Sequence, residues 1–335
     1  MPYDLRNARV LVIGGAGFIG SFVVRELLQE PVGEVIIYDN FSRGKRENIE
    51  ECLKDRRCTL FPYGGDIRDL DVLDRAMEGV DYVFHLAAMW LLHCRDFPRT
   101  AFEVNIAGTF NVLEACVKHR VKKLIYSSSA SVYGDAVETP MTEDHPFLNR
   151  NFYGATKIAG EAMCTAFYDR YGLKVIGLRY ANVYGPHQDQ QAAYTGVIPI
   201  LLNRVDSGEP VVINGDGSQA YDFIYVEDVA RANLCALKSS QEFGFYNVGT
   251  GVQTSIRELV ELLLRLTGKS IEIRYQPYDP ADARQFVKNR VLSPARAEKE
   301  LGFRFRYSLE EGLKRLISWR SRSSSEGEGR ERVAT

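Results

Sequence analysis

Three glycines near the start of the chain constrain its fold more than any other feature. Gly14, Gly17 and Gly20 follow a short apolar run, 10–13, and open a segment with helical apolar spacing, 18–28. A strand, a tight glycine turn and a helix in this order let a backbone approach a pyrophosphate closely, at the positive end of the helix. The sequence therefore predicts a dinucleotide site at this turn, with an ordinary turn as the alternative.

An acidic residue indicates which dinucleotide binds. Asp39 ends the next apolar run, 35–38, about twenty residues beyond the glycines, as the dinucleotide pattern requires. A carboxylate there accepts hydrogen bonds from the ribose hydroxyls of NAD and repels the 2′-phosphate of NADP. Arg43, Lys45 and Arg46 follow closely and could instead clamp a phosphate, or lie in a solvated loop. We predict NAD as the cofactor.

Short apolar runs alternate with helical patterns through the first half of the chain. This alternation indicates an α/β fold, a Rossmann-type doubly wound parallel sheet with helices on both faces. Ligands then bind beyond the carboxyl ends of the strands. The expected strands are 10–13, 35–38, 82–86, 124–127 and 175–178, and the expected helices are 18–30, 69–78, 98–118 and 152–171.

The pattern changes after about residue 182, where turn signals become frequent. We predict a cofactor domain made of 1–182 plus about 222–250. A smaller α/β carboxyl-terminal substrate lobe would comprise about 183–221 plus 251–318. The run 223–226 and the helix after it are expected to return to the main sheet. Residues 321–335 are rich in Ser, Gly, Glu and Arg, which predicts a disordered tail.

Composition excludes several classes of function. The 335 residues are 45% hydrophobic and 26% charged, and the net charge of −2 gives no basic field for nucleic acid. No apolar run reaches membrane-spanning length, so no membrane partner is expected. The six cysteines form no Cys-x-x-Cys pair, which favours reduced thiols and the cytoplasm. The five histidines have no ligand spacing, so no metal site is predicted.

A tyrosine and a lysine supply candidate chemistry. Tyr153 and Lys157 lie four residues apart, which places both on one face of the predicted helix 152–171. A free tyrosine has a pKa near about 10. A neighbouring ammonium favours the phenolate, as would the positive nicotinamide ring. Such a tyrosine can take a proton from a hydroxyl; the alternative is a surface helix with a snorkelling lysine.

A serine-rich segment, 127–134, leaves the end of the predicted strand 124–127. Hydroxyls at the carboxyl end of a parallel strand point into the ligand crevice. One of them could hold the reacting hydroxyl against Tyr153. The alternative is a serine-rich turn without a role in binding.

Together these motifs resemble the extended short-chain dehydrogenase/reductases, specifically the NAD-dependent epimerase/dehydratase family and its UDP-glucose 4-epimerase-like sugar-nucleotide epimerases. The similarity runs from about residue 9 to about residue 316, and clear motifs extend to about residue 251. The motifs that carry it are 14–20, 65–67, 85–88, Asn105 with 108–109, 127–134, Tyr153 with Lys157, 179–186, 222–226 and 228–230.

The resemblance implies roles for matching positions. Tyr153 would be the base, Ser129 its partner hydroxyl and Lys157 its helper. The cofactor would contact Gly14, Gly17, Phe18, Ile19, Gly20, Asp39, Asn40, Asp66, Ile67, Leu86, Ala87, Ala88, Asn105, Ser127, Tyr153, Lys157 and Tyr180. The substrate, most simply a UDP-sugar, would contact Ser129, Tyr153, Asn182, Val197, Arg284 and Arg290. Family members also dimerise, and here helices 98–118 and 152–171 would form the four-helix bundle.

Two departures bear on the substrate. Hexose 4-epimerases place an arginine for the diphosphate where this chain has Tyr221, so Arg284 or Arg290 could supply that charge, although either could equally be a surface arginine. Trp90, in an unusually apolar loop, either stacks on the sugar or packs the loop.

The residues beside the serine motif discriminate within the family. Nucleotide-sugar 4,6-dehydratases carry Asp-Glu at the positions of Ala130 and Ser131, and decarboxylases carry Glu at the position of Ser131. Neither carboxylate is present here. We therefore expect an NAD-dependent sugar-nucleotide 4-epimerase that passes through a 4-keto intermediate. The alternatives are an NAD(P)H-dependent reductase of a nucleotide-linked 4-keto sugar and a non-catalytic relative that senses dinucleotide.

Overall fold

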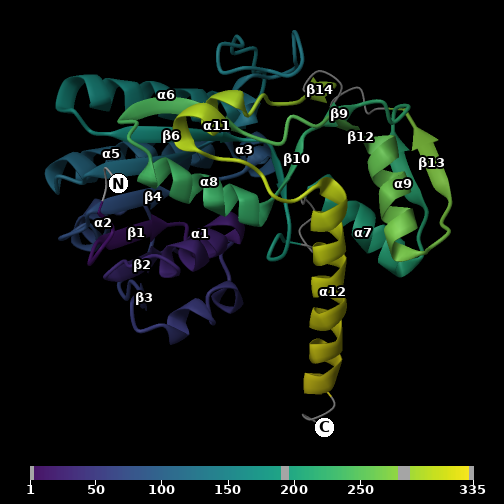
Figure 1. Cartoon of the computed structure of the whole chain (residues 1–335), viewed down its shortest axis with the longest axis horizontal. Helices are drawn as coiled ribbons and strands as arrows, with labels where there is room; N and C mark the ends of the chain where they lie inside the picture. The colour runs from purple at the N-terminus through teal and green to yellow at the C-terminus, as the bar shows by residue number, and fades with distance from the viewer. Residues whose placement is uncertain (1–3, 190–195, 278–286, 332–335) are drawn as a thin grey trace.

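A computed structural model describes residues 4–189, 196–277 and 287–331 (Figure 1). Its main sheet has seven parallel strands in the order β11-β6-β5-β4-β1-β2-β3. The order reverses at β1, which creates the crevice where ligands of such sheets bind. The strands are β1 (Arg9–Ile13), β2 (Glu34–Tyr38), β3 (Cys58–Leu60), β4 (Tyr82–His85), β5 (Lys123–Ser129), β6 (Val175–Tyr180) and β11 (Phe243–Val248).

Alternate residues of β1 enter different cores, as a sheet covered on both faces requires. Val10 and Val12 pack in one apolar cluster with helices α1 and α8. Leu11 and Ile13 pack in a second cluster with helices α2, α5 and α6. The predicted doubly wound α/β fold is confirmed.

Helical segments follow the predicted order with one difference. The predicted helix 98–118 is interrupted, because Phe102–Ala107 forms a π-helical segment (η3) between α4 and α5. The helices are α1 (Phe18–Leu28), α2 (Leu70–Ala76), α3 (Leu91–Asp96), α4 (Pro98–Ala101), α5 (Gly108–Lys118), α6 (Phe152–Tyr171) and α8 (Val226–Lys238), and the short 3-10 turns are η1 (Arg46–Asn48), η2 (Cys52–Lys54) and η4 (Ala130–Val132).

The prediction that 223–226 returns to the main sheet is wrong for the strand. β10 (Phe223–Tyr225) pairs in parallel with β7 (Asn182–Tyr184) in a separate two-stranded sheet. The place beside β6 is occupied by β11, which continues the main sheet in full register. The helix that follows, α8, does pack on the main sheet, in the same cluster as α1.

A third apolar cluster forms the core of the carboxyl-terminal lobe. It includes α9, whose first turn is closed by a capping box between Ser255 and Glu258. Two small sheets, β12-β9-β14 and β13-β8, flank it. The elements are α7 (Val197–Ser207), β8 (Val211–Asn214), β9 (Ala220–Tyr221), β12 (Thr254–Ser255), α9 (Ile256–Thr267), β13 (Ile273–Gln276), β14 (Asn289–Arg290) and α12 (Leu309–Glu331). Although α11 (Ala295–Leu301) lies in this part of the sequence, it packs in the first cluster, against α8 and β11.

The last helix extends away from the rest of the protein (Figure 1). α12 continues to Glu331, across 321–331, where composition predicts disorder. Within the described ranges, no helix combines the length and the apolar character needed to cross a membrane.

Candidate active site

The glycine turn between β1 and α1 has the geometry that a pyrophosphate needs. Gly14 adopts a left-handed backbone (φ +82°), and a Cβ there would lie 2.7 Å from the main-chain nitrogen of Ala87. A Cβ on Gly20 would overlap the carbonyl oxygen of Gly14, so the helix packs directly on the turn. Gly17 begins α1 without a side-chain cap, and the first turn carries no acidic residue. The main-chain N–H groups in the first turn of a helix have no acceptor within the helix, so those of α1 suit the phosphates of a dinucleotide.

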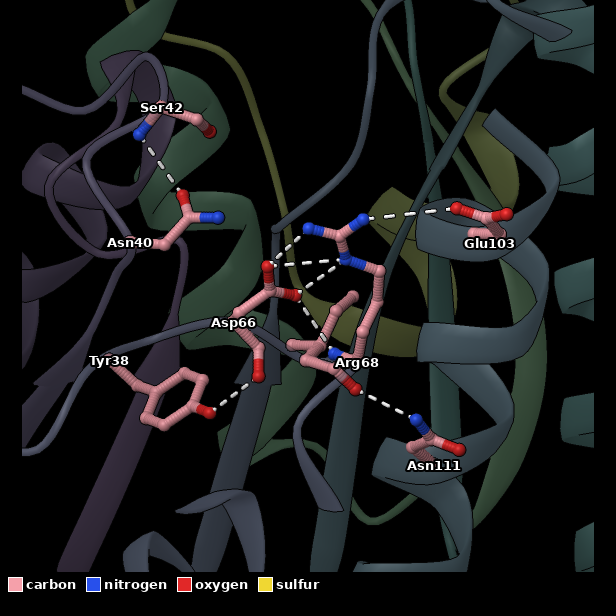
Figure 2. Close-up of polar contacts among 8 residues, drawn as sticks. Tyr38, Asn40, Ser42, Asp66, Arg68, Glu103 and Asn111 are labelled. Carbon is pink, nitrogen blue, oxygen red and sulfur yellow. Dashed lines mark hydrogen bonds and ion pairs between the residues drawn. The ribbon is translucent and has the colours of Figure 1, made fainter. Parts of the chain in front are cut away.

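Asp39, predicted to bind ribose, lies directly beside this turn. Its carboxylate accepts hydrogen bonds from the main-chain N–H groups of Ala16, at 2.9 Å, and Phe41, at 2.8 Å. Burial raises the pKa of the carboxyl, while these two bonds lower it. The next residue, Asn40, accepts a hydrogen bond from the Ser42 N–H at 3.0 Å (Figure 2).

Asp66 and Ile67, which are predicted to contact the cofactor, belong to a polar cluster (Figure 2). The Asp66 carboxylate accepts hydrogen bonds from the Arg68 guanidinium, the shortest at 2.6 Å, which lowers the pKa of that carboxyl. The Tyr38 hydroxyl donates to the Asp66 carbonyl at 2.8 Å. The Asn111 amide donates to the carbonyl of the buried Ile67 at 2.9 Å. The cluster fixes the loop after β3 at the crevice.

The loop after β4 crosses the same crevice. Its Ala87 N–H donates to the carbonyl of Ile13, at the end of β1. The Asn105 amide accepts a hydrogen bond from Met89 N–H at 2.7 Å and donates to the Met89 carbonyl at 2.9 Å. It also donates to the Thr156 hydroxyl at 3.1 Å, which joins the loop to α6. These contacts give Asn105 a positioning role, and its contact with the cofactor stays a prediction.

Helix α6 brings the predicted catalytic pair to the crevice. Asn151 caps the helix by accepting a hydrogen bond from Gly154 N–H at 2.8 Å. One turn separates Tyr153 from Lys157, whose Nζ is buried and donates to the Ser127 carbonyl at 2.6 Å. The same Nζ lies 5.7 Å from the centre of the Tyr153 ring.

Burial governs the protonation of this pair. It raises the pKa of Tyr153 to about 12, although a hydrogen bond with Ser129 and the charge of Arg290 both lower that pKa. It lowers the pKa of Lys157 to about 8. Burial opposes charge on both groups, and in the protein alone it outweighs the contributions that favour the phenolate.

Two further predicted cofactor residues form the scaffold behind the pair. Ser127 and Tyr180 are buried, and their hydroxyls lie 3.0 Å apart. The Tyr180 hydroxyl donates to the Asn233 amide oxygen, also at 3.0 Å. Since the Ser127 carbonyl accepts the Lys157 hydrogen bond, this group fixes the lysine.

Sequence reasoning missed a buried ion pair behind the serine segment. The Arg179 guanidinium contacts both carboxylate oxygens of Glu161, at 2.7 and 2.9 Å. The Ser128 hydroxyl donates to the same carboxylate at 2.6 Å. Arg179 also donates to the Tyr133 hydroxyl at 2.7 Å, which in turn donates to Asn247. The available signal was a charged residue, Arg179, in an otherwise apolar strand pattern.

The predicted substrate residues lie on several elements. Asn182 is the first residue of β7, and Val197 is the first residue of α7. Arg290 pairs in register with Tyr221, between β14 and β9. Arg284 lies outside the described residues.

Tyr221 and Arg290 differ in their contacts. The Tyr221 hydroxyl donates to the Val287 carbonyl at 2.8 Å. The Arg290 Nε is buried and has no hydrogen-bond partner among the described residues. Its charge acts on Tyr153, which places the guanidinium within electrostatic reach of the phenol. No cluster of three or more His, Cys, Asp or Glu suitable for a metal occurs in the described ranges.

Comparison with known proteins identifies relatives along nearly the whole chain. The model of the NAD dependent epimerase/dehydratase family matches residues 10–249. A UDP-glucose 4-epimerase of Mycolicibacterium smegmatis is 34% identical over 314 residues, which cover 93% of this chain and 98% of the relative.

Solved structures of UDP-glucose 4-epimerases are also similar to this chain. A UDP-glucose 4-epimerase of Thermotoga maritima with UDP-glucose superposes with a TM-score of 0.85 at 37% identity, covering 94% of this chain and 99% of that one. The Thermus thermophilus UDP-glucose 4-epimerase complex with NAD gives 0.82 at 36% identity, covering 92% and 98%. The glycine turn described above fits the dinucleotide. The chain therefore belongs to the NAD-dependent epimerase/dehydratase family, with NAD as its cofactor.

Proposed function

We propose that this protein is an NAD-dependent sugar-nucleotide 4-epimerase that acts on a UDP-sugar. The observation that carries the proposal is the meeting of Tyr153, Ser129 and Lys157 at the crevice, with no carboxylate at the two positions that follow the serine. The two positions after Ser129 hold Ala130 and Ser131. A phenol and a hydroxyl can exchange a proton with a sugar hydroxyl, but they provide no acid for eliminating water. The UDP-glucose 4-epimerases reported above support the same assignment.

The side chains divide the work as follows. Tyr153 accepts the proton of the sugar 4-hydroxyl. Ser129, which is hydrogen-bonded to Tyr153, holds the sugar hydroxyl in place. Bound NAD supplies the hydride chemistry at C4. After the 4-ketose turns its other face toward the site, Tyr153 returns the proton. Lys157, fixed on the Ser127 carbonyl, keeps the helix face that carries the phenol against the serine segment.

Arg290 is the described cation that we assign to the substrate. Its buried Nε has no partner in the part of the chain that the structure describes, and leaving such a donor unsatisfied costs free energy unless a ligand accepts its hydrogen bond. Arginine forks suit phosphate and carboxylate oxygens. Asn182, Val197 and Arg284 remain substrate contacts proposed from the family pattern.

We further propose that two copies pair through α5 and α6 to form a four-helix bundle. Large apolar side chains lie exposed on and beside these helices: Phe102 (49% exposed), Phe110 (41%), Phe152 (57%) and Tyr171 (57%). Contiguous exposed apolar surface marks interaction sites, and a two-fold axis would cover the same patch on both copies.

The redox state of the cysteines indicates the cellular compartment in which the protein works. All six cysteines are free. Because oxidising compartments favour disulfides, we propose that the protein works in the cytoplasm.

One experiment tests the function directly. The purified protein is offered UDP-, GDP-, CDP- and dTDP-sugars without added cofactor, and C4 epimers are resolved by NMR. We expect UDP-glucose and UDP-galactose to interconvert. Turnover that appears only with added NADPH would favour a 4-keto-sugar reductase instead, and no turnover with any sugar nucleotide would contradict an enzymatic role.

A further inference from the structure

One arginine joins three loops at the edge of the sheet where the cofactor binds. Arg43 follows β2 and stacks its guanidinium on the ring of Trp90, with Cζ 3.7 Å from the ring centroid. Trp90 lies between β4 and α3. The same guanidinium lies 4.0 Å from the carboxylate of Asp189, in the segment after β7.

The segment that carries Arg43 lies over the glycine turn. The Lys45 N–H donates to the carbonyl of Ala16, inside the turn, at 3.1 Å. A Cβ on Gly44 would lie 2.6 Å from the Asp39 carboxylate, so the backbone next to Arg43 packs against that residue. Arg43 is thereby fixed close to the turn and to Asp39.

The segment that carries Trp90 also contacts this turn. Its Ala87 nitrogen lies so close to Gly14 that a Cβ there would be 2.7 Å away. Met89, which precedes Trp90, makes two hydrogen bonds with the buried side-chain amide of Asn105, one through its main-chain N–H and one through its carbonyl. The arginine and the indole therefore meet beside the turn, each on an anchored backbone.

We propose that Arg43 and Trp90 form a clasp that closes over the pyrophosphate of bound NAD and retains it. The first turn of α1 reads Phe18-Ile19-Gly20-Ser21, so the helix itself brings no cation to a doubly charged pyrophosphate. A guanidinium whose face lies on an indole still has its N–H edge for oxygen acceptors. One nitrogen of that edge lies 4.0 Å from the Asp189 carboxylate, and the other N–H groups can reach phosphate oxygens. Trp90 fixes the position of the cation, and Arg43 supplies the charge. The inference rests on NAD binding and not on the epimerase activity.

The first test measures how fast NAD leaves the protein. We compare Arg43→Ala, Trp90→Ala and the double variant with Arg46→Ala, a matched control from the same loop whose side chain is exposed. Each single variant is expected to release NAD about tenfold faster, which corresponds to about 1.4 kcal/mol. The double variant should be no more than slightly faster than the single variants, because the two residues act as one unit. Arg46→Ala should stay within twofold of the wild type.

The second test asks which part of the ligand the clasp holds. In calorimetry, Arg43→Ala should weaken ADP-ribose about tenfold and leave adenosine, which has no phosphate, within twofold. Trp90→Phe keeps an aromatic face and should restore most of the retention that Trp90→Ala loses. The proposal is overturned if Arg43→Ala releases NAD no faster than Arg46→Ala, if it weakens only NADP, or if adenosine and ADP-ribose weaken equally.

Discussion

At the scale of single residues, the site depends on two groups whose protonation is set by burial. Burial raises the pKa of Tyr153 to about 12 and lowers the pKa of Lys157 to about 8, so both shifts favour the neutral forms. A positive nicotinamide ring would favour the phenolate and oppose that effect. The phenol should therefore become a useful base only with oxidised cofactor in place.

Replacing the phenol tests its role as the base. Tyr153→Phe should lower kcat by about a thousandfold or more, because positioned acid–base catalysis contributes about 10²–10⁴-fold. NAD content after purification, measured by absorbance and by release on denaturation, should match the wild type. Near-normal turnover would remove Tyr153 from the mechanism.

The lysine makes a prediction about stability. Its folded pKa of about 8 lies below the ordinary 10.5, so the unfolded chain binds the proton more tightly and the folded state carries a cost at pH 7. This cost is relieved as pH rises from 8 to 10.5. Lys157→Met should therefore raise the free energy of unfolding by about 2 kcal/mol at pH 7, after allowing for the lost hydrogen bond to Ser127, and give no gain near pH 10.5.

Denaturant unfolding of the cofactor-free protein at both pH values, with activity assayed alongside, checks this. Lys157→Met should be more stable at pH 7 yet inactive. Equal gains at both pH values would mean that the side-chain charge is not the cause.

At the scale of elements, the packing of α1 on the glycine turn connects fold and cofactor binding. Gly20 sits where any side chain would run into the Gly14 carbonyl, so the helix and the turn share one geometry. The loop after β4 contacts the same turn, because Ala87 packs against Gly14. The packing of the turn, of α1 and of the loop after β4 therefore depends on Gly14 and Gly20 having no side chain.

A substitution at this contact should show the dependence. Gly20→Ala should cost about 3 kcal/mol or more and abolish NAD retention, because the overlap is with rigid backbone and not with a flexible side chain. Gly208→Ala is the control: it ends α7 with φ +70° and open space around it, so only backbone strain of about 1 kcal/mol is expected. Thermal unfolding would measure both. Similar losses at the two positions would argue against the overlap.

At the scale of the whole molecule, buried polar contacts tie the two lobes together. The buried carboxylate of Asp222, just before β10, accepts hydrogen bonds from the hydroxyl of Thr250 at 2.6 Å and from Gly251 N–H at 3.1 Å. It also accepts one from Leu292 N–H at 3.4 Å. The segments before β10, after β11 and after β14 therefore meet at one buried carboxylate.

The proposed dimer is tested at this scale. Phe110→Glu replaces the exposed aromatic side chain of α5 with a charge and should convert the dimer to monomer in light scattering. Tyr63→Glu is a matched control, since that side chain is 68% exposed in the segment after β3 and belongs to neither α5 nor α6. A wild-type protein that is monomeric at micromolar concentration would contradict the four-helix bundle.

Short-range patterns in the sequence determined the α/β class, the glycine turn and the Tyr153–Lys157 pair. Each depends on residues close together along the chain, where strand and helix periods and glycine backbone freedom act directly. The helix 152–171 was predicted with the bounds that the structure shows.

Tertiary structure alone decided the rest. The strand β3 has only three residues and gains its place by pairing with β2, and β11 excludes β10 from the main sheet by its register with β6. The pKa of Tyr153 follows burial more than the nearby ammonium that sequence spacing reveals. The stacking of Arg43 on Trp90 joins distant segments whose approach is fixed only when the sheet forms, because contacts of long sequence separation leave no periodic trace in the chain.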